Sequence, residues 1–278
     1  MLNVGLGLLE NTLVALIGFG PMAAVLYLGL RPHAERFDYA KSTSMLFIGI
    51  IAGVFLAVAH MIAEYGVTVA PGLLLIEVIF ALITSLFILF VFNRPRFAAS
   101  HESPFFGAVL GGGLGSMVPL GLGYRIIRTP SAAAGFLTPE ILSQLLAFAF
   151  IQVAMMASAG ALVAYGVYRR EVLQFTAYAA SVQIAVYAIM IPGILQPGDL
   201  GLTFLTLGVA LAFALVCWMA VVGGLFPKCS PSPEKKAKKV AAKAADRTEP
   251  GSGKSEAGVR PAGMDILAEG SPAWRTGK

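Results

Sequence analysis

The chain has 278 residues, of which 57% are hydrophobic and 13% are charged, and its mean hydropathy is +0.79. Few soluble domains are so apolar. The net charge of +5 arises after residue 226, because residues 1–226 contain equal numbers of basic and acidic side chains. Composition therefore argues against a soluble globular enzyme and against a nucleic-acid-binding protein, and it predicts an integral membrane protein.

Seven long apolar runs predict an all-α, polytopic membrane protein with about seven transmembrane helices. Each run is close to or above the ~20 residues that a helix needs to cross a ~30 Å hydrocarbon core. The chain begins without a basic n-region or a small-residue cleavage site, so we expect the first run to be a retained span. In chain order the predicted spans are Thr12–Leu30, Ser44–Ala63, Val67–Phe92, Phe105–Leu122, Ile141–Val167, Leu173–Leu195 and Leu200–Phe226.

The basic residues are distributed unevenly between the two sides of this seven-span arrangement. Eighteen of the twenty lysine and arginine residues lie in the first, third and fifth connections and in the tail, whereas Arg125 and Arg128 lie in the fourth. Cytoplasmic loops carry the excess of positive charge in membrane proteins. The pattern therefore predicts an outside N-terminus and a cytoplasmic C-terminus.

The composition changes after residue 227. Residues 1–227 are expected to form the transmembrane domain, with membrane lipids as their surroundings. Residues 228–278 are rich in lysine, alanine, serine and proline and poor in aromatic residues, which predicts a basic, disordered cytoplasmic tail. This tail has two interpretations, a surface that binds anionic lipid or a solvated segment that keeps the protein soluble.

The fourth predicted span is unusually rich in glycine. Gly107, Gly111 and Gly115 recur every four residues, which predicts a flat strip on one helix face and close contact with a neighbouring helix. The run GGGLG lacks the lysine and the preceding strand of a phosphate-binding loop. We therefore interpret it as a packing surface.

Three ionisable residues, His60, Glu64 and Glu77, lie within or near the ends of the second and third spans. His60 and Glu64 are four residues apart and share one helix face. His60 lies about eight residues before the predicted turn and Glu77 about nine after it, so both are expected ~12–13 Å from the turn. Their equal depth predicts a hydrogen bond or ion pair between His60 and Glu77.

Ionisable groups inside a membrane are energetically costly and need partners. For this trio the partner can be a bound ion or proton, or another residue of the trio. Histidine and carboxylates are zinc ligands, so His60, Glu64 and Glu77 are candidate metal ligands or a proton site. Alternatively, a single buried pair fixes the hairpin between the two spans.

The order of segments resembles the PrsW family of intramembrane metalloproteases over most of residues 15–195. The resemblance rests on four stretches, GFGPMAAVLYLGLRPHAERFDYAKSTSMLFIGIIAG, LLLIEVIFALITSLFILFVFNRPRFAASHESPFFGAVLGGGLGSM, QVAMMASAGALVAYGVYRR and AASVQIAVYAIM. The family has a Glu-Glu-x-x-Lys helix, a basic loop, a glycine-rich span, a helix that begins with histidine, and a helix with His-x-x-x-Asn or His-x-x-x-Asp. The resemblance implies an intramembrane protease fold with a zinc-bound water.

The chain departs from the family at the positions that carry this chemistry. Glu77 matches one carboxylate of the Glu-Glu-x-x-Lys motif and is the candidate catalytic residue. Gln152 stands at the first histidine position, and Gln183 and Tyr187 stand in the His-x-x-x-Asn frame. Amides are poor zinc ligands beside imidazole, so we expect no zinc at the family site and hydrogen bonds between helices from both glutamines.

These residues leave three functional predictions. The first is a PrsW-like pseudoprotease of the cell membrane, without a cofactor, that binds or holds other transmembrane proteins. The second is an active metalloprotease whose rearranged site binds zinc through His60, Glu64 and Glu77. The third is a small transporter or channel, with Glu77, Gln152 and Gln183 along a polar path.

Overall fold

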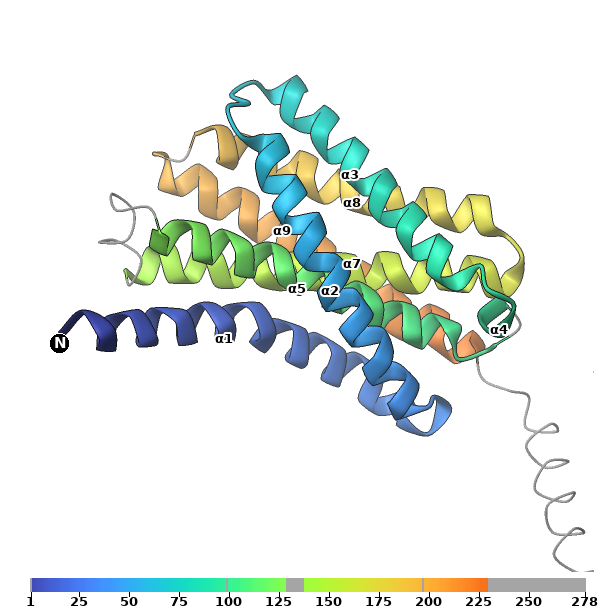
Figure 1. Ribbon diagram of the computed structural model, residues 1–278. Helices are drawn as coiled ribbons and strands as arrows, with labels where there is room; N and C mark the ends of the chain where they lie inside the picture. Colours follow the sequence, from blue (N-terminus) through green and yellow to red (C-terminus); the bar gives the residue numbers. More distant parts are fainter. Residues whose placement is uncertain (1, 99, 129–137, 197, 230–278) are drawn as a thin grey trace, which may run out of the picture. The chain divides into compact units, whose positions relative to one another are not determined.

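The computed structural model describes residues 2–98, 100–128, 138–196 and 198–229, and within these residues it contains helices and no strand (Figure 1). Seven of the described helices are long and apolar enough to cross a membrane. The predicted fold class is confirmed, and the chain is an all-α, multi-pass membrane protein. In chain order the elements are α1 (Leu2–Leu30), η1 (Arg31–Arg36), α2 (Tyr39–Glu64), α3 (Ala70–Phe92), α4 (Pro95–Ala98), α5 (Ser103–Arg128), α7 (Pro139–Arg169), α8 (Val172–Leu195), α9 (Leu200–Ala220), η2 (Val221–Leu225) and η3 (Phe226–Cys229).

Several helices extend beyond the predicted spans, and α1 and α5 do so by the most residues. α1 begins at Leu2 rather than Thr12, and within this added stretch the Asn11 amide donates to the Gly7 carbonyl at 2.6 Å. α5 continues past Leu122 to Arg128, so the two basic residues expected in a connection lie in its last turn. Positive charge at a helix C-terminus is favourable because the unpaired carbonyls there are partly negative.

α5 and α7 form the centre of the helix bundle and are buried over most of their lengths. α1 and α2 pack on α5, α8 and α9 pack on α7, and α3 packs on α8. Figure 1 shows α5 and α7 side by side, with α2 crossing α5 steeply. α2 and α3 therefore diverge from each other along most of their lengths and meet near the turn that joins them.

Glycine residues allow α5 and α7 to approach closely, as the sequence predicts. A Cβ atom added at Gly107 would meet the backbone carbonyl of Gly160, and one added at Gly111 would meet that of Met156. Gly115, one turn further along, also faces the backbone of α7. The predicted glycine strip is confirmed as a helix-packing surface, where the absence of side chains lets two backbones touch.

A second glycine contact, on α2, is absent from the sequence predictions. A Cβ atom added at Gly49 would meet the carbonyl of Leu110, and one added at Gly53 would lie 3.0 Å from the carbonyl oxygen of Leu114. α2 therefore lies against the other side of α5. The contact continues toward the end of α2, where Ala57 packs with Met117 and Val118 of α5.

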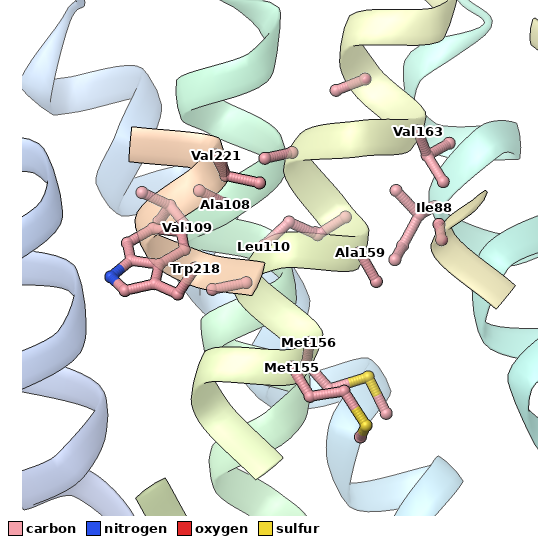
Figure 2. Close-up of a cluster of buried hydrophobic side chains, with 14 of the residues drawn as sticks. Ile88, Ala108, Val109, Leu110, Met155, Met156, Ala159, Val163, Trp218 and Val221 are labelled. Atoms are coloured by element: carbon pink, nitrogen blue, oxygen red, sulfur yellow. The ribbon is translucent and has the colours of Figure 1, made fainter. Parts of the chain in front are cut away.

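Apolar side chains from four helices fill the space around α7 (Figure 2). Ile88 of α3 packs beside Val163, and Leu110 of α5 extends toward α7. Trp218 of α9 lies next to Val221, the first residue of η2. This core is apolar, in contrast to the polar side chains that are buried elsewhere in the bundle.

α9 ends in an irregular turn. η2 is a π-helical turn, and the 3₁₀ turn η3 follows it. Phe226 is fully buried, with its ring centroid 4.6 Å from that of Phe105 and 5.5 Å from that of His33. Cys217 and Cys229 are both free thiols. The predicted tail, residues 228–278, lies outside the described residues apart from Lys228 and Cys229.

Candidate functional site

The turn between α2 and α3 brings His60 and Glu77 together. Gly66 adopts a left-handed backbone conformation (φ +81°) in this turn, which glycine accommodates without steric cost. The Nε2 atom of His60 lies 3.0 Å from the Oε1 atom of Glu77, and the two side chains are only 6% and 2% exposed. The predicted His60–Glu77 contact is confirmed.

Glu64 completes the cluster from the last residue of α2. Its Oε2 atom lies 3.7 Å from the Nδ1 atom of His60, and its side chain is partly exposed. The two nitrogen atoms of one imidazole ring therefore face two different carboxylates. The Phe80 ring packs nearly perpendicular to the His60 ring, with ring centroids 4.7 Å apart. One nitrogen or oxygen atom from each of the three residues lies within 4.8 Å of the others.

The glutamines at the family histidine positions are also buried and hydrogen-bonded between helices. The Tyr187 hydroxyl of α8 donates to the Gln152 Oε1 atom of α7 at 3.1 Å. The Gln183 amide donates to the Ser85 hydroxyl of α3 at 3.1 Å and to the Ala179 carbonyl of its own helix at 3.3 Å. The expected interhelical hydrogen bonds of both glutamines are confirmed.

These two groups of residues belong to one polar centre. The ring of Tyr187 lies 5.9 Å from that of His60, which places the α7–α8 pair beside the α2–α3 pair. A cavity of about 10 Å³ lies between them, lined by polar and apolar side chains that include His60, Phe80, Thr84, Gln183 and Tyr187. That volume is the size of a single water molecule.

Several buried polar atoms of this polar centre lack a hydrogen-bond partner among the described residues, and two of them belong to residues that line the cavity. They are Glu77 Oε2, Thr84 Oγ1, Gln152 Nε2 and Gln183 Oε1. A buried polar atom without a partner costs about 1–3 kcal/mol. A small polar ligand that bonds to these atoms would remove this cost.

Thr84 and Ser85 contribute to the centre but are not among the residues that the sequence analysis singles out. The available signal is their position on α3, seven and eight residues after Glu77, where they interrupt an otherwise apolar helix. Two turns of helix return a side chain to the same face. A hydroxyl residue seven positions after an intramembrane carboxylate therefore lies on the same helix face, whereas Ser85, one residue further, bonds to Gln183 rather than to Glu77.

The residues at the family positions do not fit the zinc ion that the resemblance implies. The oxygen of Gln152 accepts a hydrogen bond from Tyr187, and the nitrogen of Gln183, which cannot bind a metal, points at Ser85. Of these positions only Glu77 offers a strong metal ligand. A hydrolytic step through zinc at these positions is therefore unsupported.

No family model, curated protein or solved structure matches the chain. We therefore infer function from the geometry of the helices and of this polar centre.

Proposed function

We propose that the chain is a PrsW-like protein of the cell membrane that has lost hydrolytic activity and binds or holds other membrane proteins. One feature supports the resemblance, and two support the loss of activity. Glu77, Gln152, Gln183 and Tyr187 come from three helices and converge at one centre, as the active-site positions of such a protease must. Their amides are hydrogen-bonded within the centre, and the adjacent cavity of about 10 Å³ has room for one water but not for a peptide.

The observation that carries the binding role is an apolar groove between α1, α7 and α9. Its volume is about 620 Å³, and its lining includes Leu28 of α1, Phe150 of α7, and Leu215 and Met219 of α9. Gly223 also lines the groove, and a Cβ atom added there would meet nothing within 4 Å. Small residues beside apolar ones let a second transmembrane helix approach closely.

Photo-cross-linking in the native membrane tests this proposal. A photoreactive phenylalanine analogue at Met219, inside the groove, should give discrete products with one or a few membrane proteins. The matched position is Phe55 of α2, which is exposed and apolar but lies outside the groove. Mass spectrometry of the products identifies the partner.

Two further variants separate specific binding from chance collision. Gly223→Phe should remove the products because the new ring fills the groove. Gly208→Phe should leave them unchanged, because Gly208 is equally open but does not line the groove. Identical products from Met219 and Phe55, or products that survive Gly223→Phe, would contradict the binding role. Cleavage of a model membrane substrate that Glu77→Gln abolishes would contradict the loss of hydrolysis.

The proposed orientation places the N-terminus outside and the C-terminus in the cytoplasm, as the distribution of basic residues indicates. A reporter enzyme that folds only in the cytoplasm should be active when fused after residue 226. The same reporter fused in the turn at Gly66 should be inactive. The reverse pattern of activities would show that the chain has the opposite orientation.

A further inference from the structure

We infer that His60, Glu64 and Glu77 form a binding site for a divalent transition-metal ion such as zinc, which joins the end of α2 to α3. Two of the three ligands, His60 and Glu64, lie on α2, outside the positions of the family's zinc site. The site stands apart from the α1–α9 groove and does not depend on the proposed binding role.

His60 and Glu77 already have a spacing that suits a shared ion, whereas Glu64 has to move toward it. Ligands about 2.0–2.1 Å from a tetrahedral zinc ion lie roughly 3.4 Å from one another. The His60 Nε2 and Glu77 Oε1 atoms are 3.0 Å apart, and the farthest pair of candidate ligand atoms in the trio is within 4.8 Å. Glu64 is at the end of α2 and partly exposed, so rotation of its side chain can bring its carboxylate to the ion.

The neighbouring cavity supplies the remaining coordination position. Zinc takes four ligands, and the trio provides three. The cavity of about 10 Å³ beside His60 has room for one water, and Thr84 and Gln183 line it. The Gln183 side chain is fully buried, and its Oε1 atom and the Thr84 hydroxyl lack hydrogen-bond partners among the described residues. Both can accept hydrogen bonds from a metal-bound water.

The charges of the cluster also favour a dication. Both carboxylates pair with the same imidazole, so a protonated His60 can neutralise only one of them. A net charge within a membrane span is costly. A divalent ion with two carboxylates and a neutral imidazole is electrically balanced. The small cavity leaves no space for a peptide beside the ion. The role of the ion is therefore structural, because it joins α2 to α3.

The test uses the full-length protein in detergent, loaded with zinc and dialysed, with metal content measured by mass spectrometry. We expect about one zinc ion per chain in the wild type. His60→Gln and Glu77→Gln keep a hydrogen-bonding side chain but remove a ligand, and each should weaken zinc binding by at least about 100-fold. Glu64→Gln, at the partly exposed edge, should weaken it while leaving the fold intact.

Matched controls and a spectroscopic readout complete the test. His101→Gln and Glu140→Gln change the same residue types outside the cluster and should retain the ion. Cobalt in place of zinc should give the visible absorption of a four-coordinate nitrogen–oxygen site in the wild type and in both controls, but not in His60→Gln or Glu77→Gln. A folded wild-type protein without zinc above background would overturn the inference. So would zinc retained in both His60→Gln and Glu77→Gln.

Discussion

Replacing Gly111 with alanine is expected to destabilise the protein more than any other single methyl addition on α5. The new Cβ atom would meet the backbone carbonyl of Met156 and lie 3.2 Å from the Cα atom of Ala157. A side-chain neighbour can rotate away, but a helix backbone cannot. α5 and α7 would have to separate along their whole contact. We expect a cost at the upper end of the roughly 1–3 kcal/mol that overpacking causes.

Gly208→Ala is the matched control for this change. Gly208 lies within α9, and a Cβ atom there meets nothing within 4 Å. Alanine favours helix over glycine by about 1 kcal/mol, so this variant should be as stable as the wild type or more so. Thermal unfolding in detergent, followed by size-exclusion chromatography, compares the two. Equal melting temperatures for both variants would show that α5 and α7 are not in backbone contact.

Replacing His60 with leucine should destabilise the protein strongly, and a second substitution should recover part of the loss. His60→Leu leaves the carboxylate of Glu77 buried, with only 2% of the residue exposed, and removes its 3.0 Å partner. Breaking a buried pair from one side costs about 3–5 kcal/mol. The double variant His60→Leu, Glu77→Leu removes both polar groups, so we expect it to be more stable than His60→Leu alone.

Unfolding of the wild type, both single variants and the double variant forms a thermodynamic cycle that isolates the pair. The measurements require a chelator, so that no metal contributes. Glu140→Leu is the control, because Glu140 is exposed at the start of α7 and its removal should have little effect. Additive effects of the two single substitutions would mean that the His60–Glu77 contact contributes nothing to folding.

The sequence predicts the fold class and one contact of the site well because both depend on local rules. Span length follows from the thickness of a bilayer. The contact between His60 and Glu77 follows from counting residues on either side of a turn, since each residue adds about 1.5 Å of helix. The glycine strip at Gly107, Gly111 and Gly115 follows from a four-residue spacing.

The sequence does not predict which helices lie at the centre of the bundle or which polar residues meet across it. Membrane lipid and protein core are both apolar, so a buried face of α7 and a lipid-facing side of α3 have similar side chains. The hydrogen bond between Gln183 and Ser85 joins residues 98 positions apart. It depends on how α3 packs on α8, and no local pattern specifies that packing.

The π-helical turn η2 rotates the side chains that follow it about the helix axis, relative to where a regular α-helix would place them. In a regular α-helix, successive residues are about 100° apart, so a side chain returns to its original direction after seven residues rather than eight. Trp218 and Phe226 are eight residues apart, yet both are buried and their ring centroids lie 6.0 Å from each other. The extra residue of the π turn restores their alignment. The residues before the π turn can therefore bury one face of α9, and the residues after it can bury a different one. At that end Phe226 packs against His33 and Phe105.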